Sequence, residues 1–280
     1  MGFGLLIFIL PYLAFNYTIS GHIFPNTFYA KQQEYASVIK DFSLITRWLN
    51  LTTVTLVGTQ ILLIPGLINS LINIIKQKTH TLALIALWWF SYLTLYSFLL
   101  PVTYQHGRYQ IPTIPWLLLL GLWGSYHLFQ KKRRLLSIKI ITKTWIASFT
   151  LIIFIFIGLG AQAYGNDVTF IETEMVKTAQ WLNQNTPPKA IIAAHDIGAI
   201  GYFTQRHIVD LAGLITPAVI PFIRDETKLL AFAKKQQATY LVTFPSWYPS
   251  ITALYPKIYT TNSPWAIKAN HDNMAVYQLN

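Results

Sequence analysis

The chain has 280 residues, of which 53% are hydrophobic and only 11% charged, and its mean hydropathy is +0.41. This composition excludes an ordinary soluble globular domain and indicates a membrane protein in contact with the lipid bilayer. Cysteine is absent, which excludes disulfides, thiolate metal sites and cysteine nucleophiles. The formal net charge is +11, but no cationic, aromatic-interleaved surface is visible, so we do not expect a nucleic-acid partner.

Five apolar segments are predicted to cross the membrane: residues 3–19, 51–75, 82–102, 112–129 and 145–163. A crossing helix needs about 20 mostly apolar residues, and the first segment is the shortest of the five. A signal peptide is the alternative for that segment, although the basic n-region and the small-residue cleavage site are missing. Because no cation precedes the first segment, we expect the natural chain to continue upstream of Met1 or to need a partner chain.

The basic residues predict the orientation of the chain. Residues 1–164 contain 12 of the 21 Lys and Arg but only 2 of the 10 Asp and Glu. The cations gather at residues 76–78 and 131–143, and loops rich in Lys and Arg stay in the cytoplasm. Residues 20–50, the short HGRYQ loop and everything after residue 165 are therefore expected outside a plasma membrane that the chain crosses several times.

The first outer loop contains the stretch HIFPNTFYAK, residues 22–31. Its Pro-Asn pair is a turn signal, and Tyr29 and Lys31 after it could face a phosphate or a glycan. The alternative is an aromatic loop that lies in the membrane interface, with Lys31 extended toward the headgroups. Glu34 follows closely and is, with Asp41, one of the two carboxylates of the membrane half; it is either a base near a site or a solvated charge.

The stretch HGRYQIPTIP, residues 106–115, opens the fourth predicted span. An arginine at membrane depth is costly and tends to mark a polar site, and its planar fork of donors suits phosphate. Arg108, with Tyr104, His106 and Tyr109 beside it, is therefore a candidate binding group. The alternative is interfacial anchoring, since Arg and Tyr are common at headgroup level.

After residue 164 the pattern changes to alternating helices and short apolar strands. Helices are predicted at 172–185 and 226–235, and strands at 190–194, 207–211, 239–244 and 275–279. The expected fold class is therefore a membrane α-helical region of about five helices, residues 1–164, followed by a small extracytoplasmic α/β domain, residues 165–280.

His195 and Asp196 follow the first strand of this domain, where α/β folds often place binding residues. The alternative for Asp196 is a turn or helix cap. The G-x-G-x-x-G motif that dinucleotide binding requires is absent. The sequence also has no P-loop, no G-x-S-x-G elbow and no metal-ligand spacing. We therefore assign no metal site and no catalytic residue from the sequence.

Three separated motifs carry a family resemblance: PNTFYAK in the first outer loop, GRYQIPTIP at the start of a span, and WLNQNTPPKAIIAAHDIGAIGYFTQRHIVDLAGL in the outer domain. In this order they resemble the carboxyl-terminal part of bacterial GT-C glycosyltransferases. Within that group, the chain is most similar to the arabinosyltransferase-like and mannosyltransferase-like membrane proteins.

The resemblance implies transfer of a sugar from a polyprenyl-phosphate donor to a cell-envelope acceptor, a glycan or a protein, on the outer side of the membrane. Arg108 would bind the donor phosphate, Tyr104, His106 and Tyr109 would line that site, and Lys31 and Tyr29 would be secondary contacts. The outer domain, with His195 and Asp196, would help to hold the acceptor. No cofactor is implied with certainty, and a divalent cation is left open.

The chain departs from the family because the region that usually carries the catalytic aspartate is absent, so enzymatic activity stays open at this point. The alternative is a non-enzymatic membrane protein, derived from such an enzyme, whose outer domain binds a glycan or a protein partner. A transporter has little support, because paired inverted halves are missing.

Overall fold

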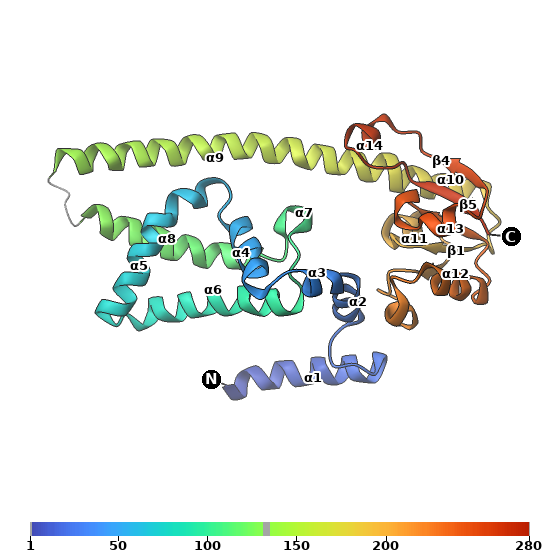
Figure 1. Cartoon of the computed structure of the whole chain (residues 1–280), viewed down its shortest axis with the longest axis horizontal. Coiled ribbons are helices and arrows are strands. Elements are labelled where there is room, and N and C mark those ends of the chain that lie inside the picture. The colour runs from blue at the N-terminus through green and yellow to red at the C-terminus, as the bar shows by residue number, and fades with distance from the viewer. Residues whose placement is uncertain (1, 131–134, 280) are drawn as a thin grey trace. The chain divides into compact units, whose positions relative to one another are not determined.

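The computed structural model describes residues 2–130 and 135–279, with side chains from residue 6 onward. Its internal contacts divide the chain into two compact units (Figure 1). One unit comprises Met1–Glu34 and Ala163–Asn280, and the other comprises Tyr35–Gln162. Residues 1–34 therefore belong with the carboxyl-terminal third. The predicted division at residue 164 had instead grouped them with the membrane helices.

The unit Tyr35–Gln162 is helical throughout its described part. Its elements are α3 (Ala36–Asp41), α4 (Leu44–Thr55), η1 (Gly58–Leu63), α5 (Ile64–Gln77), α6 (His80–Leu99), α7 (Tyr104–Gly107), η2 (Ile111–Thr113), α8 (Ile114–Gln130) and most of α9 (Leu136–Phe170). Ser43 caps α4, because its side chain accepts a hydrogen bond from the backbone N–H of Thr46 at 3.2 Å.

Within the described residues, three helical stretches are long and apolar enough to cross a membrane: Gly58–Gln77, His80–Leu99 and Leu136–Asn185. The prediction of about five crossing helices is therefore not confirmed. The segment predicted at 51–75 is interrupted, because α4 ends at Thr55 and a new helical stretch begins at Gly58, whose φ is +74°. The segments predicted at 3–19 and 112–129 form α1 (Gly2–Ser20) and α8, which fall outside the three.

Helices α5 and α8 approach closely through small residues. Gly66 and Ser70 on α5 face Gly121, Gly124 and Ser125 on α8, and a Cβ added to Gly124 would lie 1.9 Å from the backbone oxygen of Gly66. The hydroxyl of Ser70 donates to the carbonyl of Leu120 at 2.6 Å, and Asn69 donates to the carbonyl of Gly124 at 2.9 Å. Small residues four apart with polar hydrogen bonds between helices are typical of membrane helix packing.

The other unit contains a five-stranded sheet of order β2-β1-β3-β5-β4. Its strands are β1 (Ile191–Ala194), β2 (His207–Asp210), β3 (Tyr240–Thr243), β4 (Lys257–Thr260) and β5 (Ala275–Gln278). The pairs β1–β2 and β1–β3 are parallel, whereas β3–β5 and β4–β5 are antiparallel. The four predicted strands are confirmed within a residue or two at each end, and β4 is an additional strand that the pattern did not reveal.

Helices cover both faces of this sheet, because strand side chains alternate between the faces. Ile192 and Ala194 of β1 belong to a core with α10 (Lys177–Asn185) and α11 (Ile197–Thr204), and Ala193 belongs to a second core with α12 (Glu226–Lys235) and α13 (Pro249–Thr252). The remaining short helices are η4 (Pro217–Phe222), η5 (Pro245–Trp247) and α14 (Pro264–Lys268). The predicted α/β character of residues 165–280 is confirmed, as is the helix predicted at 226–235.

The helix predicted at 172–185 is also confirmed, although its first turns are the π-helical stretch η3 (Ile171–Val176). This stretch contains Glu174, whose side chain is fully buried. The carboxylate of Glu174 accepts hydrogen bonds from the Thr261 hydroxyl, from Asn273 at 3.2 Å and from the backbone N–H of Met274 at 2.7 Å. A buried carboxylate with three donors is satisfied, and it links η3 to the segment between β4 and β5.

The short helix α2 (Asn26–Glu34) packs on this α/β fold although more than 150 residues separate them along the chain. Ala30 is 1% exposed and lies beside the glycine at position 213, where an added Cβ would be 3.5 Å from the Ala30 Cβ. Arg224 donates from both Nε, at 2.9 Å, and Nη2 to the carbonyl of Glu34. Because a helix leaves its last carbonyls unpaired, this guanidinium caps the end of α2.

Candidate functional site

The candidate site lies at the carboxyl ends of the parallel strands of the sheet. The chain leaves β1 toward β2 on one side, and β3 lies on the other side of β1. The loops after β1 and β3 therefore diverge, and open α/β sheets bind their ligands between such loops, at the position that we call the crevice. His195 is the residue after β1, and residues 244–248 follow β3.

His195 connects the two sides of this crevice. Its Nδ1 atom lies 2.7 Å from the hydroxyl of Tyr248, and its ring packs edge-on against Trp247 with centroids 4.8 Å apart. On the other side, its Nε2 atom is 3.8 Å from Oε1 of Glu34. The imidazole thus stands between a phenol and a carboxylate.

The end of α2 brings Glu34 and Lys31 to the same place. Nζ of Lys31 donates to Oε2 of Glu34 at 2.6 Å, so one carboxylate oxygen is paired with a lysine while the other faces His195. The Glu34 side chain is only 15% exposed. Of the two alternatives for Glu34, the solvated loop charge is therefore wrong.

Burial sets the protonation of this cluster. Desolvation lowers the pKa of His195 and outweighs the carboxylates of Asp196 and Glu34, which act in the opposite direction, so the imidazole is neutral at pH 7. Burial also raises the pKa of the Tyr248 phenol, which keeps its proton and can donate it to Nδ1. The proton of the neutral imidazole then lies on Nε2, the nitrogen nearer to Glu34.

Asp196 lies beside His195 at the N-cap position of α11, but its side chain makes no capping hydrogen bond. Burial raises the pKa of its carboxyl group. The capping alternative is therefore not realised by the side chain, and a second acidic group borders the crevice.

Three contributors escaped the sequence reasoning. Tyr248 and Trp247 lie in a loop whose only signal is its place after a strand, and their contact with His195 spans about 50 residues. Asp210, at the end of β2, is fully buried and accepts the backbone N–H groups of Ala212 and Ile215, both at 2.7 Å. An aspartate at a strand end before a glycine-containing turn predicts a side chain that binds the backbone of that turn. Asp210 holds the loop against which α2 packs in this way.

Tyr29 lies on α2 but faces a different neighbourhood. Its ring is 4.8 Å from the ring of His22 and 5.3 Å from that of Phe28. Of the two α2 residues proposed as donor contacts, the structure thus brings Lys31 to the His195 cluster, and Tyr29 joins the aromatic loop before α2.

The residues around Arg108 belong to the other unit and form a second cluster. Nη2 of Arg108 donates to the hydroxyl of Tyr109 at 3.0 Å, and its guanidinium lies 5.5 Å and 4.9 Å from the ring centroids of Tyr104 and Tyr109. The two tyrosine hydroxyls are 3.3 Å apart. The Arg108 side chain is exposed, so an incoming anion can reach the guanidinium.

The backbone before Arg108 is strained. Gln105, His106 and Gly107 are consecutive residues with positive φ, at 51°, 57° and 68°. Left-handed conformations of non-glycine residues cost roughly 1–2 kcal/mol each and tend to occur at functional sites. Gly107 also has no room for a side chain, because a Cβ would lie 2.3 Å from Cγ1 of Val54. His106 is exposed on this turn.

Among residues 2–130 and 135–279, no group of three or more His, Asp or Glu side chains is arranged to hold a metal ion.

One family model matches part of the chain. Residues 162–277 match a family model described as "Domain of unknown function (DUF8728)". This match contains His195, Asp196 and Tyr248, whereas Glu34, Lys31 and the Arg108 cluster lie outside it. No curated protein and no solved structure matches the chain.

Proposed function

We propose that this protein is a membrane glycosyltransferase of the GT-C type, which transfers a sugar from a polyprenyl-phosphate donor to an envelope acceptor outside the plasma membrane. The observation that carries the proposal is the Glu34 carboxylate, only 15% exposed, paired with Lys31 and 3.8 Å from His195 at the crevice of the sheet. Glycosyl transfer to a hydroxyl needs a base. Glu34 supplies the carboxylate that the membrane half otherwise offers only in the exposed Asp41.

In this proposal, Glu34 takes the proton of the acceptor hydroxyl as that oxygen attacks the anomeric carbon of the donor sugar. The bond between the anomeric carbon and the phosphate oxygen breaks, and the polyprenyl phosphate leaves with the bonding electrons. Arg108 keeps the role that the resemblance implies for it, binding of the donor phosphate, since a guanidinium paired with tyrosine hydroxyls suits that charge. Lys31 orients the Glu34 carboxylate through its 2.6 Å hydrogen bond, and the neutral His195 lies near the other carboxylate oxygen.

The topology of the proposal follows from the docking of α2. Because α2 packs against the α/β fold, both lie on the same side of the membrane, and the chain between them must cross the bilayer an even number of times. Three crossing stretches lie between Glu34 and the sheet. We propose α8 as the fourth, because its 17 residues give about 26 Å of helix, close to the thickness of the hydrocarbon core.

With α1 as the crossing before α2, the chain would have five crossing helices. The lysines at positions 76 and 78 would then lie in the cytoplasm, in agreement with the positive-inside rule. The α/β fold would lie outside the cell, where the lipid-linked sugar is presented.

The test is transfer of labelled sugar in proteoliposomes, with polyprenyl-phosphate mannose and polyprenyl-phosphate arabinose offered as separate donors. Glu34→Gln should lower kcat/KM by about 100-fold or more, as expected for loss of a general base. Asp41→Asn is the matched control, because it removes the exposed carboxylate of the membrane half, and it should retain native turnover. Arg108→Ala should abolish donor-dependent transfer.

Equal turnover by the native protein and Glu34→Gln would disprove the base role. Absence of transfer from both donors, together with retained binding of envelope glycan by the native protein, would favour the non-enzymatic binding protein instead. The exposed indole of Trp247 at the crevice is the surface that such binding would use.

A further inference from the structure

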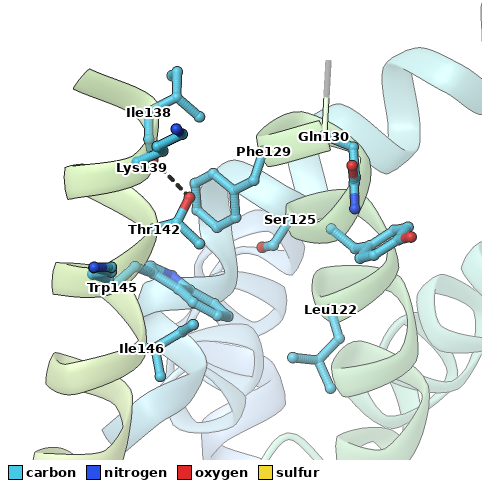
Figure 2. A pocket seen from close by; sticks show the side chains of 11 residues that line it. Leu122, Ser125, Phe129, Gln130, Ile138, Lys139, Thr142, Trp145 and Ile146 are labelled. Carbon is cyan, nitrogen blue, oxygen red and sulfur yellow. Dashed lines mark hydrogen bonds between the residues drawn. The ribbon is translucent and has the colours of Figure 1, made fainter. Parts of the chain in front are cut away.

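A groove lies between the last turns of α8 and the first turns of α9, within the unit Tyr35–Gln162 (Figure 2). Its volume is about 600 Å³, within the range of sites that hold a small ligand. The groove is at the opposite end of α8 from Arg108, which precedes that helix. It is therefore separate from the donor site proposed above, and an inference about it does not rest on the proposed function.

The groove changes from polar to apolar along its length. Gln130 and Lys139 lie at one end, near the points where α8 ends and α9 begins, and Leu122 and Ile146 lie at the other (Figure 2). Lys143 also lines the groove, one helical turn after Lys139 and on the same face of α9. The side chains of Lys139 and Lys143 thus line one wall of a groove that is otherwise largely apolar.

The apolar end of the groove is stabilised by an indole. Trp145 donates from Nε1 to the carbonyl of Leu62 at 2.9 Å and packs against Phe129 with ring centroids 5.5 Å apart. These contacts fix the indole between α9 and the helices beside it, so the wall is preformed and needs no rearrangement to receive a chain.

The surroundings of the groove favour an occupant from the bilayer. Helix α9 has no buried residue over its 35 described positions, and it belongs to the most apolar of the three stretches that are long enough to cross a membrane. Such a surface is stable only in contact with hydrocarbon. A groove on its face is therefore accessible to lipid chains, and its cations are suited to an anionic headgroup.

We propose that this groove binds an anionic diacyl phospholipid of the membrane, with its phosphate between Lys139 and Lys143 and one acyl chain along Leu122, Trp145 and Ile146. Ammonium groups attract phosphate as point charges, and Gln130 and Thr142 add hydrogen-bonding groups at the same end of the groove. The hydroxyl of Thr142 already donates to the carbonyl of Ile138 at 2.7 Å, so it can donate to the phosphate only after rotation, and the lysines dominate.

The test is native mass spectrometry of the full chain in detergent, titrated with dioleoyl phosphatidylglycerol, dioleoyl phosphatidylcholine or decaprenyl phosphate. The native protein should retain phosphatidylglycerol in preference to the other two lipids. The double variant Lys139→Gln/Lys143→Gln should weaken phosphatidylglycerol binding by about 30-fold, as two phosphate-facing lysines imply. Lys76→Gln/Lys78→Gln is the matched control, since these two exposed lysines lie at the end of another apolar stretch and do not line the groove, and it should bind as the native protein does.

Ile146→Trp tests the apolar end, because the larger side chain fills the groove without changing its charge. It should also release the lipid. Unchanged binding in the Lys139→Gln/Lys143→Gln variant, equal loss in the control pair, or full retention in Ile146→Trp would each overturn the site. Preference for decaprenyl phosphate would overturn the assignment to a diacyl lipid.

Discussion

Gly213→Ala is the change whose cost the structure defines best. Gly213 lies in the loop after β2 with a φ of +75°, a left-handed conformation that costs an L-residue roughly 1–2 kcal/mol. An added Cβ would be 2.8 Å from Cγ1 of Ile220, closer than side-chain carbons approach each other. Because Ile220 is half-buried and can partly yield, we expect a further roughly 1–2 kcal/mol from crowding.

The substitution should therefore destabilise the α/β fold by about 2–4 kcal/mol. It should also loosen α2, because the new methyl group would press toward Ala30 and move Glu34 away from His195. Hydrogen exchange of the full chain in detergent, followed at the amides of β1, measures the first effect. At about 1.4 kcal/mol per tenfold change, the β1 amides should exchange about 30- to 800-fold faster.

Gly201→Ala is the matched control for this change. Gly201 lies inside α11, and its added Cβ would meet only Cγ1 of Ile208 at 3.8 Å, an ordinary contact. Alanine is the better helix former, so this variant should be more stable by roughly 0.5–1 kcal/mol. Exchange in Gly213→Ala within threefold of the native rate, or a loss of stability as large in Gly201→Ala, would refute the reasoning from the loop geometry.

Three further predictions concern other parts of the chain. Gly124→Ala should destabilise the pairing of α5 and α8 by about 1–3 kcal/mol in thermal unfolding, because its Cβ would lie 1.9 Å from a backbone oxygen of α5. Gly158→Ala is the control and should not destabilise the protein, because a Cβ at Gly158 would have no heavy atom within 4 Å. Glu174→Gln should cost about 1–3 kcal/mol in the same assay, because an amide nitrogen would face donors where the carboxylate accepts three hydrogen bonds; the exposed Glu172→Gln should be neutral. The pKa of His195 is lower in the folded chain than its unfolded value of 6.5, so the unfolded state takes up protons first and the free energy of unfolding should fall as the pH drops below 6.5. His195→Gln should reduce that loss of stability. An identical pH dependence of stability in the variant and the native protein would contradict the burial of the imidazole.

Local patterns in the sequence determined the type of most elements. The helix predicted at 226–235 coincides with α12, and the four predicted strands of the outer domain are present. These predictions succeeded because the spacing of apolar residues within a short segment indicates which face of the helix or strand will be buried. The high apolar content likewise predicted membrane helices, and the described residues contain three helical stretches that are long and apolar enough to cross a membrane.

Other features depended on contacts between distant residues and were not visible in any window. The interruption between Thr55 and Gly58 lies inside the segment 51–75 that was predicted as one span, and its mostly apolar composition did not divide it. The small residues of α5 and α8 became meaningful only as a pair, since close approach needs both surfaces. Strand order was also hidden, because β5 lies between β3 and β4 although it comes last in the chain.

The candidate site shows the same division. The sequence by itself singled out His195, Asp196, Lys31 and Glu34 as chemistry-bearing residues in loops or at a strand end. Only the tertiary structure decided that Glu34 lies beside His195, because the capping of α2 by Arg224 and the burial of Ala30 bring together segments more than 150 residues apart. The chemistry of a side chain follows from its residue type alone. Whether two side chains from distant segments meet depends on which surfaces of the folded chain are complementary in shape and charge.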